Sequence, residues 1–389
     1  MRWIAALAAA GLASAASAGE PGRPRRLTVG AEISAAMGPE DHGFFNYTSY
    51  SDSAQRLARL SLTAEWRASD QVALLGEVRD ENLEKPRVYA LYLRVRPWRE
   101  RPVDVQAGLI PPVFGAFARR RYGADNALIG YPLAYQYLTS LRYDAVPGTP
   151  GDLIANRGAG WRVLYPFGRG AQSAQPGLPL ANALQWDAGV QVRLGSGPWQ
   201  ASGAVTQGTL SSPHVRDDNG GKQLSGRVAW TGVTGLVLGA SGARGEYLSR
   251  NALADVTAAR PGPYRQQAWG VDAEYSRDRW ILRSEAVWSA WDSPMFARPL
   301  RALGVAGEGR CKLVPGLYAA ARLDHLGFSR IDGPAGPVPW DAAVWRTEAG
   351  IGYTPTRHVL AKLVYQHNWR DGGRVREQGF MIGQLLLWF

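Results

Sequence analysis

Hydrophobic and polar side chains alternate along most of the chain, in segments of about ten residues. In residues 59–67 every second position is apolar: Leu60, Leu62, Ala64 and Trp66. The positions between them carry Arg59, Ser61, Thr63, Glu65 and Arg67. Because successive side chains of a β-strand point to opposite faces, this pattern predicts a strand with one apolar and one strongly polar face. The alternation returns around residues 72–79, 91–96, 103–109, 186–194, 269–276, 317–324, 345–353 and 359–368.

Two architectures accommodate such strands. A soluble sandwich buries the apolar faces, whereas a membrane barrel turns them to lipid and encloses the polar faces around a lumen. Charges of both signs in the middle of strands favour an aqueous lumen. Aromatic residues near strand ends favour the girdles of a membrane barrel: Trp66, Trp98, Trp199, Trp230, Trp280, Tyr353 and Trp388. The pattern therefore favours the barrel.

The connections between strands alternate in length, as in outer-membrane barrels with short turns at one end and long loops at the other. Short turns are predicted at 67–70, 97–102, 195–198, 231–235, 276–279, 311–315 and 354–357. Long connections are predicted at 37–53, 80–86, 111–183, 208–222, 248–266, 291–299 and 329–339, with a shorter link at 370–373. Seven hairpins, a first strand at 26–35 and a last at 376–389 make sixteen strands. Residues 160–167 also have strand character, but an odd strand breaks the even count, so we place them inside the third connection.

The two ends of the chain indicate export to a membrane. Residues 1–18 have a basic start, an apolar stretch and a small-residue Ala16-Ser17-Ala18 site, which predicts a cleaved signal peptide; an N-terminal membrane helix is the alternative. Residues 19–389 are then one barrel domain. The chain ends in GQLLLWF, which places Leu385, Leu387 and Phe389 on one face. An aromatic last residue on a final strand resembles the assembly signal of bacterial outer-membrane proteins. This resemblance implies recognition by the barrel-assembly machinery, through Phe389, and residence in the outer membrane.

Composition adds a strong positive charge, a net +11 with four lysines among 44 basic residues. The arginines are scattered along alternating strands rather than gathered on one face, which argues against nucleic-acid binding. The single Cys311 makes no internal disulfide and has no neighbouring ligands for a metal. Asp324, His325 and Ser329 are the only local grouping that suggests a hydrolase, and adjacent strand residues point to opposite faces. We therefore expect no catalytic residues, no metal and no cofactor.

The long third connection is the strongest functional feature. Residues 111–183 are rich in proline, tyrosine and glycine, and a loop of this length is normally functional or disordered. We expect it to fold into the barrel and narrow it, with Arg119, Arg120, Arg121 and Tyr122 at the constriction. The alternative is an extracellular loop whose arginines face water.

The stretch from residue 64 to 117 resembles the corresponding region of the phosphate-selective porins O and P. The matching residues of its turn are Gly108, Pro111, Pro112, Phe114 and Gly115. The resemblance implies a sixteen-stranded channel with a loop anchored at these residues, a homotrimer and a preference for anions. The near absence of lysine departs from the family, so we do not extend phosphate specificity to this chain.

The predicted inner faces carry nearly equal numbers of bases and acids. The bases are Arg59, Arg79, Arg94, Arg96, Arg193, Arg227, Arg283, Arg322, Arg346 and Lys362. The acids are Glu65, Glu77, Asp104, Asp187, Asp272, Glu274, Glu285, Asp324 and Glu348. Rows of opposite charge across a pore set ion preference, although the same pairs could simply brace neighbouring strands.

The predicted function is a passive channel for small hydrophilic solutes with a weak anion preference, in contact with outer-membrane lipid and lipopolysaccharide. A plugged structural or adhesin barrel is the first alternative. An outer-membrane hydrolase is the second.

Overall fold

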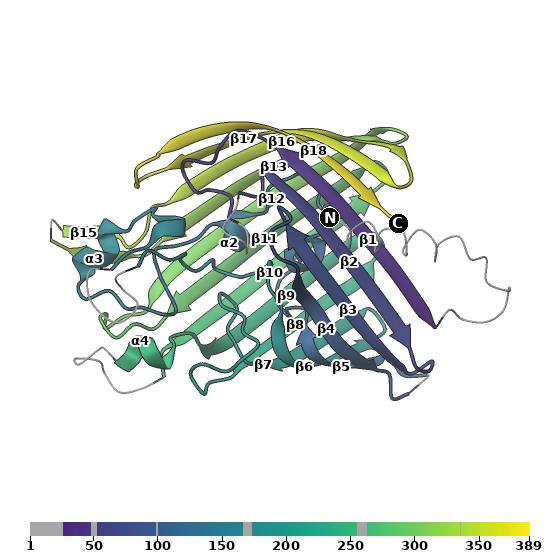
Figure 1. Ribbon diagram of the computed structural model, residues 1–389, viewed down its shortest axis with the longest axis horizontal. Helices are drawn as coiled ribbons and strands as arrows, with labels where there is room; N and C mark the ends of the chain where they lie inside the picture. Colours follow the sequence, from purple (N-terminus) through teal and green to yellow (C-terminus); the bar gives the residue numbers. More distant parts are fainter. Residues whose placement is uncertain (1–25, 48–52, 99, 166–172, 255–262, 335) are drawn as a thin grey trace.

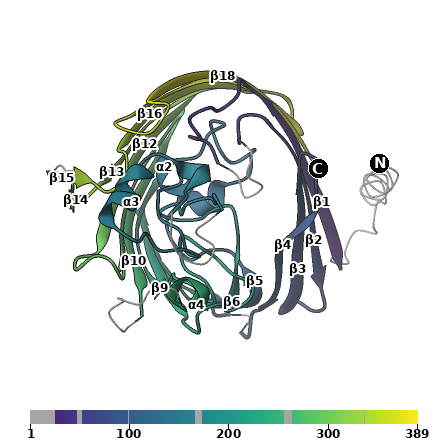
Figure 2. The same ribbon diagram turned by 60° about the vertical axis from the view of Figure 1, so that its left-hand side comes forward.

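The computed structural model describes residues 26–47, 53–98, 100–165, 173–254, 263–334 and 336–389, without the side chains of residues 118 and 119. The predicted signal peptide lies outside these residues. Sixteen antiparallel strands close into one barrel (Figures 1 and 2), in the ring order β1-β18-β17-β16-β13 and then down to β2. Its strands are β1 (Leu27–Met37), β2 (Leu57–Arg67), β3 (Val72–Glu81), β4 (Arg87–Val95), β5 (Val103–Ile110), β6 (Asp187–Ser196), β7 (Trp199–Thr206), β8 (Gln223–Val233), β9 (Leu236–Glu246), β10 (Arg265–Arg277), β11 (Trp280–Trp291), β12 (Leu300–Val314), β13 (Leu317–Phe328), β16 (Val344–Thr356), β17 (Val359–Arg370) and β18 (Glu377–Trp388).

The barrel turns its apolar rows outward. On β17, Leu363 and Tyr365 are 49% and 47% exposed, whereas Gln366 and Asn368, which alternate with them, are fully buried inside. A soluble sandwich would show the opposite arrangement. The predicted architecture is confirmed, because only a hydrocarbon solvent favours apolar rows as the outermost surface.

All seven predicted short turns join the strands expected, and the long connections lie at the other end of the barrel. The connection between β13 and β16 holds an additional hairpin, β14 (Arg330–Gly333) and β15 (Gly336–Pro339), which forms a separate two-stranded sheet. Residues 160–167 contribute no barrel strand in their described part. They form the 3-10 helix η2 (Gly160–Arg162) and one isolated bridge from Val163 to Gln175.

The chain ends close the ring. The Phe389 amide donates to the Ala31 carbonyl and the Ala31 amide donates to the Phe389 carbonyl, both at 3.1 Å. Phe389 is 41% exposed on the outer face with the leucines of its row. Trp388, predicted for the aromatic girdle, instead packs against the buried cluster inside the barrel. Successive side chains of a strand point to opposite faces, so Trp388 points inward because its neighbour Phe389 points outward.

The hydrophobic core lies inside the barrel, between the wall and the connection from β5 to β6. We call residues 111–186 the inward loop; Figure 2 shows it within the ring of strands. It contains η1 (Phe117–Arg120), α2 (Leu133–Gln136), α3 (Pro150–Ala155) and η2, and a further short helix, α4 (Arg250–Ala254), follows β9. The wall offers inward apolar side chains to this loop from β18: Phe380, Ile382 and Leu386. Among the described residues no helix is both long and apolar enough to cross a bilayer.

Candidate functional site in the lumen

The start of the inward loop is fixed by the backbone conformations of two glycines and by a contact between Phe114 and the distant strand β10. Gly108 (φ 129°) and Gly115 (φ 65°) both adopt backbone conformations that favour glycine. Phe114 is 1% exposed and packs on β10, where a Cβ added to Gly270 would lie 3.0 Å from its ring. Pro111 and Pro112 lie between β5 and this contact. The predicted anchor residues thus direct the chain from β5 into the lumen.

Carboxylates of the wall and of one neighbouring connection accept hydrogen bonds from the backbone of the inward loop. Glu348 accepts from the amides of Ile129 (3.2 Å) and Gly130 (2.8 Å). Glu285 accepts from the Ala116 amide at 2.8 Å and from the Tyr135 hydroxyl at 2.6 Å. An irregular buried loop needs such partners, because an unpaired buried amide costs free energy.

Two further acids do the same at other points of the loop. Glu32 on β1 accepts from the Gly123 amide at 3.1 Å. Asp341, in the connection before β16, accepts from the amides of Ser140 (2.6 Å) and Gly158 (2.8 Å). Burial raises the pKa of Asp341 to about 6, although the three backbone amides bonded to it oppose the shift.

Wall cations donate to the loop carbonyls in the same way. The Lys362 ammonium donates to the carbonyls of Gly123, Asn126 and Leu128, at 2.6, 2.7 and 3.0 Å. Arg322 donates to the Gly130 carbonyl at 2.8 Å and Arg346 to the Tyr131 carbonyl at 2.9 Å. These charges therefore position the loop as well as bracing the strands.

The predicted arginine cluster separates onto two walls. Arg120 lies 3.5 Å from Glu308 on β12, while Arg121 lies 3.1 Å from Glu77 on β3. The Tyr122 hydroxyl donates to Glu77 at 2.5 Å, and burial raises the pKa of this phenol. The Arg119 side chain lies outside the described part of the structure. The cluster thus spans the lumen, and its Arg121 is buried rather than facing open water.

Arg120 and Arg121 thus form a bridge across the lumen between β12 and β3. Aromatic rings enclose its β3 end. The Arg79 guanidinium lies 3.7 Å from the Tyr89 ring centroid, and Arg121 lies 4.1 Å from that of Trp186 and 4.4 Å from that of Tyr89. Alternation within residues 186–194 predicts that Trp186 shares the apolar, outward face with Ala188, Val190, Val192 and Leu194. Trp186 precedes β6 and lies beside Tyr89 and Tyr92 instead, because the alternation starts only where the strand does.

Several of the remaining predicted lumen residues form a ladder of ion pairs. Arg283 pairs with Glu274 (2.7 Å) and Glu308 (3.0 Å), and Arg322 contacts Glu308, Asp324 and Glu348. Arg193 lies opposite Asp104 in the β5–β6 register. Sequence reasoning missed Glu32, which the alternation within residues 27–37 could have revealed. It also missed Asp341, for which the sequence carries no periodic signal.

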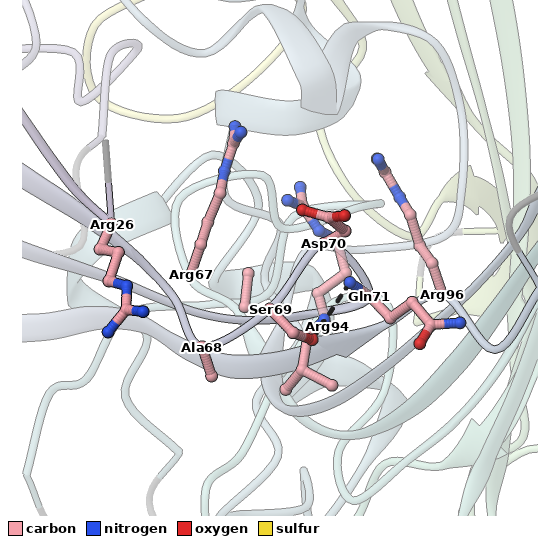
Figure 3. A pocket seen from close by; sticks show the side chains of 10 residues that line it. Arg26, Arg67, Ala68, Ser69, Asp70, Gln71, Arg94 and Arg96 are labelled. Carbon is pink, nitrogen blue, oxygen red and sulfur yellow. Dashed lines mark hydrogen bonds between the residues drawn. The ribbon is translucent and has the colours of Figure 1, made fainter. Parts of the chain in front are cut away.

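A cavity of about 890 Å³ opens at the short-turn end, beneath the turn between β2 and β3. Its charged lining residues are Arg26, Arg67, Asp70, Arg94 and Arg96. Figure 3 shows Arg67 and Arg96 extending to the same side, with Asp70 between them. Arg94 and Arg96 were predicted for the lumen. The alternation also placed Arg67 on the polar face, but the sequence did not reveal that Arg26 and Arg67 meet Arg94 and Arg96 in one cavity.

The grouping that suggested a hydrolase is not assembled. Asp324 faces inward and accepts from Arg322 Nε at 3.0 Å. His325 lies on the other face, stacked 4.1 Å from Trp345, with its Nδ1 at 3.2 Å from the Val344 carbonyl oxygen. The acid therefore cannot orient the imidazole.

Comparison with known proteins gives likeness of fold. No protein-family model and no curated protein matches the sequence. Among solved structures, OmpT, an outer membrane protein of Vibrio cholerae, superposes with a TM-score of 0.56 at 10% identity, over 95% of this chain and 100% of that one. OmpF of Salmonella typhi in complex with daunomycin gives 0.56 at 13% identity, over 93% and 97%. The anion-selective porin from Comamonas acidovorans gives 0.56 at 9% identity, over 93% and 99%. The chain has the fold of bacterial outer-membrane porins.

Proposed function

We propose that this protein is a channel of the bacterial outer membrane through which small hydrophilic solutes diffuse passively. One observation carries the proposal: a closed sixteen-stranded barrel whose outward rows are apolar and whose inner wall bears charges of both signs. Lipid solvates the first surface and water the second. The likeness in fold to porins supports the same conclusion, and the separation of Asp324 from His325 favours a channel over a hydrolase.

The inward loop is the proposed constriction of this channel. Arg120 and Arg121 cross the lumen between β12 and β3, so solutes would pass beside a bridge of fixed positive charges. Part of that charge is neutralised, because each arginine contacts a glutamate. A weak rather than strong preference for anions is the result we expect. The anion-selective porin among the structural neighbours is consistent with it.

A plugged barrel is the second candidate function, and one observation favours it. The inward loop bonds to acids and cations on β1, β3, β11, β12, β13, β16 and β17, and its apolar side chains form a buried core with the wall. A loop held at so many points could seal the lumen. In that case the barrel would serve as a structural or adhesive element.

Recording from planar bilayers distinguishes the two. Stepwise conductance of the refolded protein, with a reversal potential in a salt gradient that indicates anions, supports the channel. A membrane that stays silent after insertion, with insertion shown by protease protection, contradicts it and supports the plug. Chemical cross-linking in the same detergent extract tests the homotrimer. Co-purified lipopolysaccharide tests the lipid contact.

A further inference from the structure

The cationic cavity at the short-turn end is distinct from the loop constriction. Its lining holds four arginines and one acid, Asp70, and it lies at the rim of β2, β3 and β4. Glu65 and Asp104 accept hydrogen bonds from these arginines, and when they are included the four bases still outnumber the three acids. By contrast, Arg121 within the loop bridge is 2% exposed and enclosed by rings.

The strand register explains why this cavity exists. Arg67 on β2 and Arg94 on β4 both pair with Ala73 of β3, which lies between them. Strands are spaced about 4.8 Å apart, so the two arginine Cα atoms are separated by roughly 10 Å. The methyl side chain of Ala73 does not fill the space between them. The side chains of Arg67 and Arg94 therefore line a cavity whose floor is formed by the small side chain of Ala73.

Fixed acids pre-orient these arginines without covering them. Glu65 Oε1 accepts from Arg67 Nε at 2.8 Å and from Arg94 Nη2 at 2.9 Å, and Arg96 Nε donates to Asp104 at 3.3 Å. The Arg67 and Arg96 side chains are nonetheless 51% and 55% exposed. The turn between β2 and β3 is fixed too, because Ser69 Oγ accepts from the amides of Gln71 and Val72. Arginine held in this way matches carboxylate and phosphate groups, which it binds through paired hydrogen bonds.

We propose that the short-turn mouth is a binding site for small oxyanions, namely solutes that carry a carboxylate or a phosphate group. Arg67 and Arg96 contact the anion, Arg94 supports them through the shared acids, and Asp70 limits the affinity so that solutes leave again. The inference deepens the proposed channel function and rests on it: the site concentrates oxyanions at one end of the passage, in addition to the weak anion preference proposed for the inward loop.

The test is equilibrium binding to the refolded full chain in detergent micelles. Saturation-transfer NMR reports binding of succinate, and phosphorus NMR reports binding of inorganic phosphate. The double substitution Arg67→Gln and Arg96→Gln should weaken the affinity for whichever of the two anions binds more tightly, by at least about threefold. Asp70→Asn should strengthen that affinity about twofold. Arg277→Gln is the matched control. Its arginine is 73% exposed on another short-turn hairpin, outside the cavity, and its substitution should change nothing.

Binding that the double substitution leaves unchanged overturns the proposal, as does binding that Arg277→Gln weakens equally. The relative affinities for succinate and phosphate show which oxyanion class fits. Circular dichroism and heat-dependent gel migration establish that each variant is folded. Bilayer recording separates this inference from the channel function: bound oxyanion without conductance contradicts the channel alone, while conductance with unaltered binding in the double variant contradicts the mouth site alone.

Discussion

Arg120 and Arg121 are neighbours in the chain, yet they contact acids on nearly opposite walls of the barrel, Glu308 on β12 and Glu77 on β3. In the ring of sixteen strands these walls are nine positions apart in one direction and seven in the other. The inward loop therefore crosses the lumen at this point and is fixed from both sides.

Substitution of Glu77 tests this bridge. Glu77 is 3% exposed and contacts Arg79, Arg121 and the Tyr122 hydroxyl. Glu77→Gln leaves two buried guanidinium groups without their shared acid, a loss of about 3–5 kcal/mol for a buried pair. We expect a lower unfolding temperature and noisier, larger conductance steps. Glu40→Gln, at a side chain that is 71% exposed, should leave both measurements unchanged. Equal behaviour of the two variants would contradict the bridge.

Lys362 gives a second test of loop anchoring, from the β17 wall. Lys362→Met keeps an unbranched apolar side chain of similar length but removes the donor to three loop carbonyls. An unsatisfied buried carbonyl costs about 1–3 kcal/mol. Limited proteolysis should then cut within residues 123–131 much faster than in the native protein. Lys312→Met, on the exposed end of β12, is the matched control and should not be cut faster. Protection that survives in the Lys362 variant would show that the loop does not depend on this contact.

Gly115 isolates the effect of the loop anchor. Its φ is 65°, and an added Cβ would collide with Tyr135 and Glu285. Gly115→Ala therefore combines backbone strain, about 1–3 kcal/mol, with displacement of the Glu285 contacts. Gly197→Ala has a similar φ of 53° but meets nothing within 4 Å, so it measures the strain alone. Denaturant unfolding should show the larger loss for Gly115→Ala. Equal losses would mean that the collision is relieved elsewhere.

The pH dependence of loop anchoring follows from Asp341. Burial raises its folded pKa to about 6 from a model-peptide value of 3.8. A raised carboxyl pKa means that the folded state binds the proton more tightly. Its contribution to stability is therefore full below about pH 4 and is lost as pH rises through about 6, amounting to about 3 kcal/mol at most. Hydrogen exchange at the Ser140 and Gly158 amides, corrected for intrinsic rates, should quicken between pH 5 and 7. Asp341→Asn should abolish this pH dependence, and a pH dependence that persists in the variant assigns it to another group.

Phe389 tests the predicted assembly signal. Phe389→Ala retains the two backbone hydrogen bonds to Ala31 and removes only the outward ring. We expect severalfold less folded protein in the outer membrane, measured by immunoblot of heat-modifiable protein. Leu385→Ala removes apolar surface from the same outward row, where Leu385 is 48% exposed, and should reduce assembly far less. An equal reduction would indicate general loss of lipid contact rather than recognition of the terminus.

The sequence by itself determined the barrel, its sixteen strands and its seven short turns. Alternation with a period of two is a local property, so residues such as Leu60 and Glu65 reveal their faces without knowledge of their neighbours. The start of the inward loop was located by the resemblance of residues 64–117 to the phosphate-selective porins, whose matching residues include Gly108 and Gly115; the structure shows that both adopt a positive φ. The outward facing predicted for Trp186 and Trp388 is wrong. Both residues lie at strand ends, where the alternation gives only a weak local signal.

Only the tertiary structure decided which charges meet. Arg120 and Arg121 share one local pattern and separate onto opposite walls, while Asp341 binds two amides of a loop nearly 200 residues earlier in the chain. Such pairings depend on the path of an irregular loop through the lumen. That path is set by the need to satisfy its buried backbone groups against the wall, and this requirement has no period in the sequence.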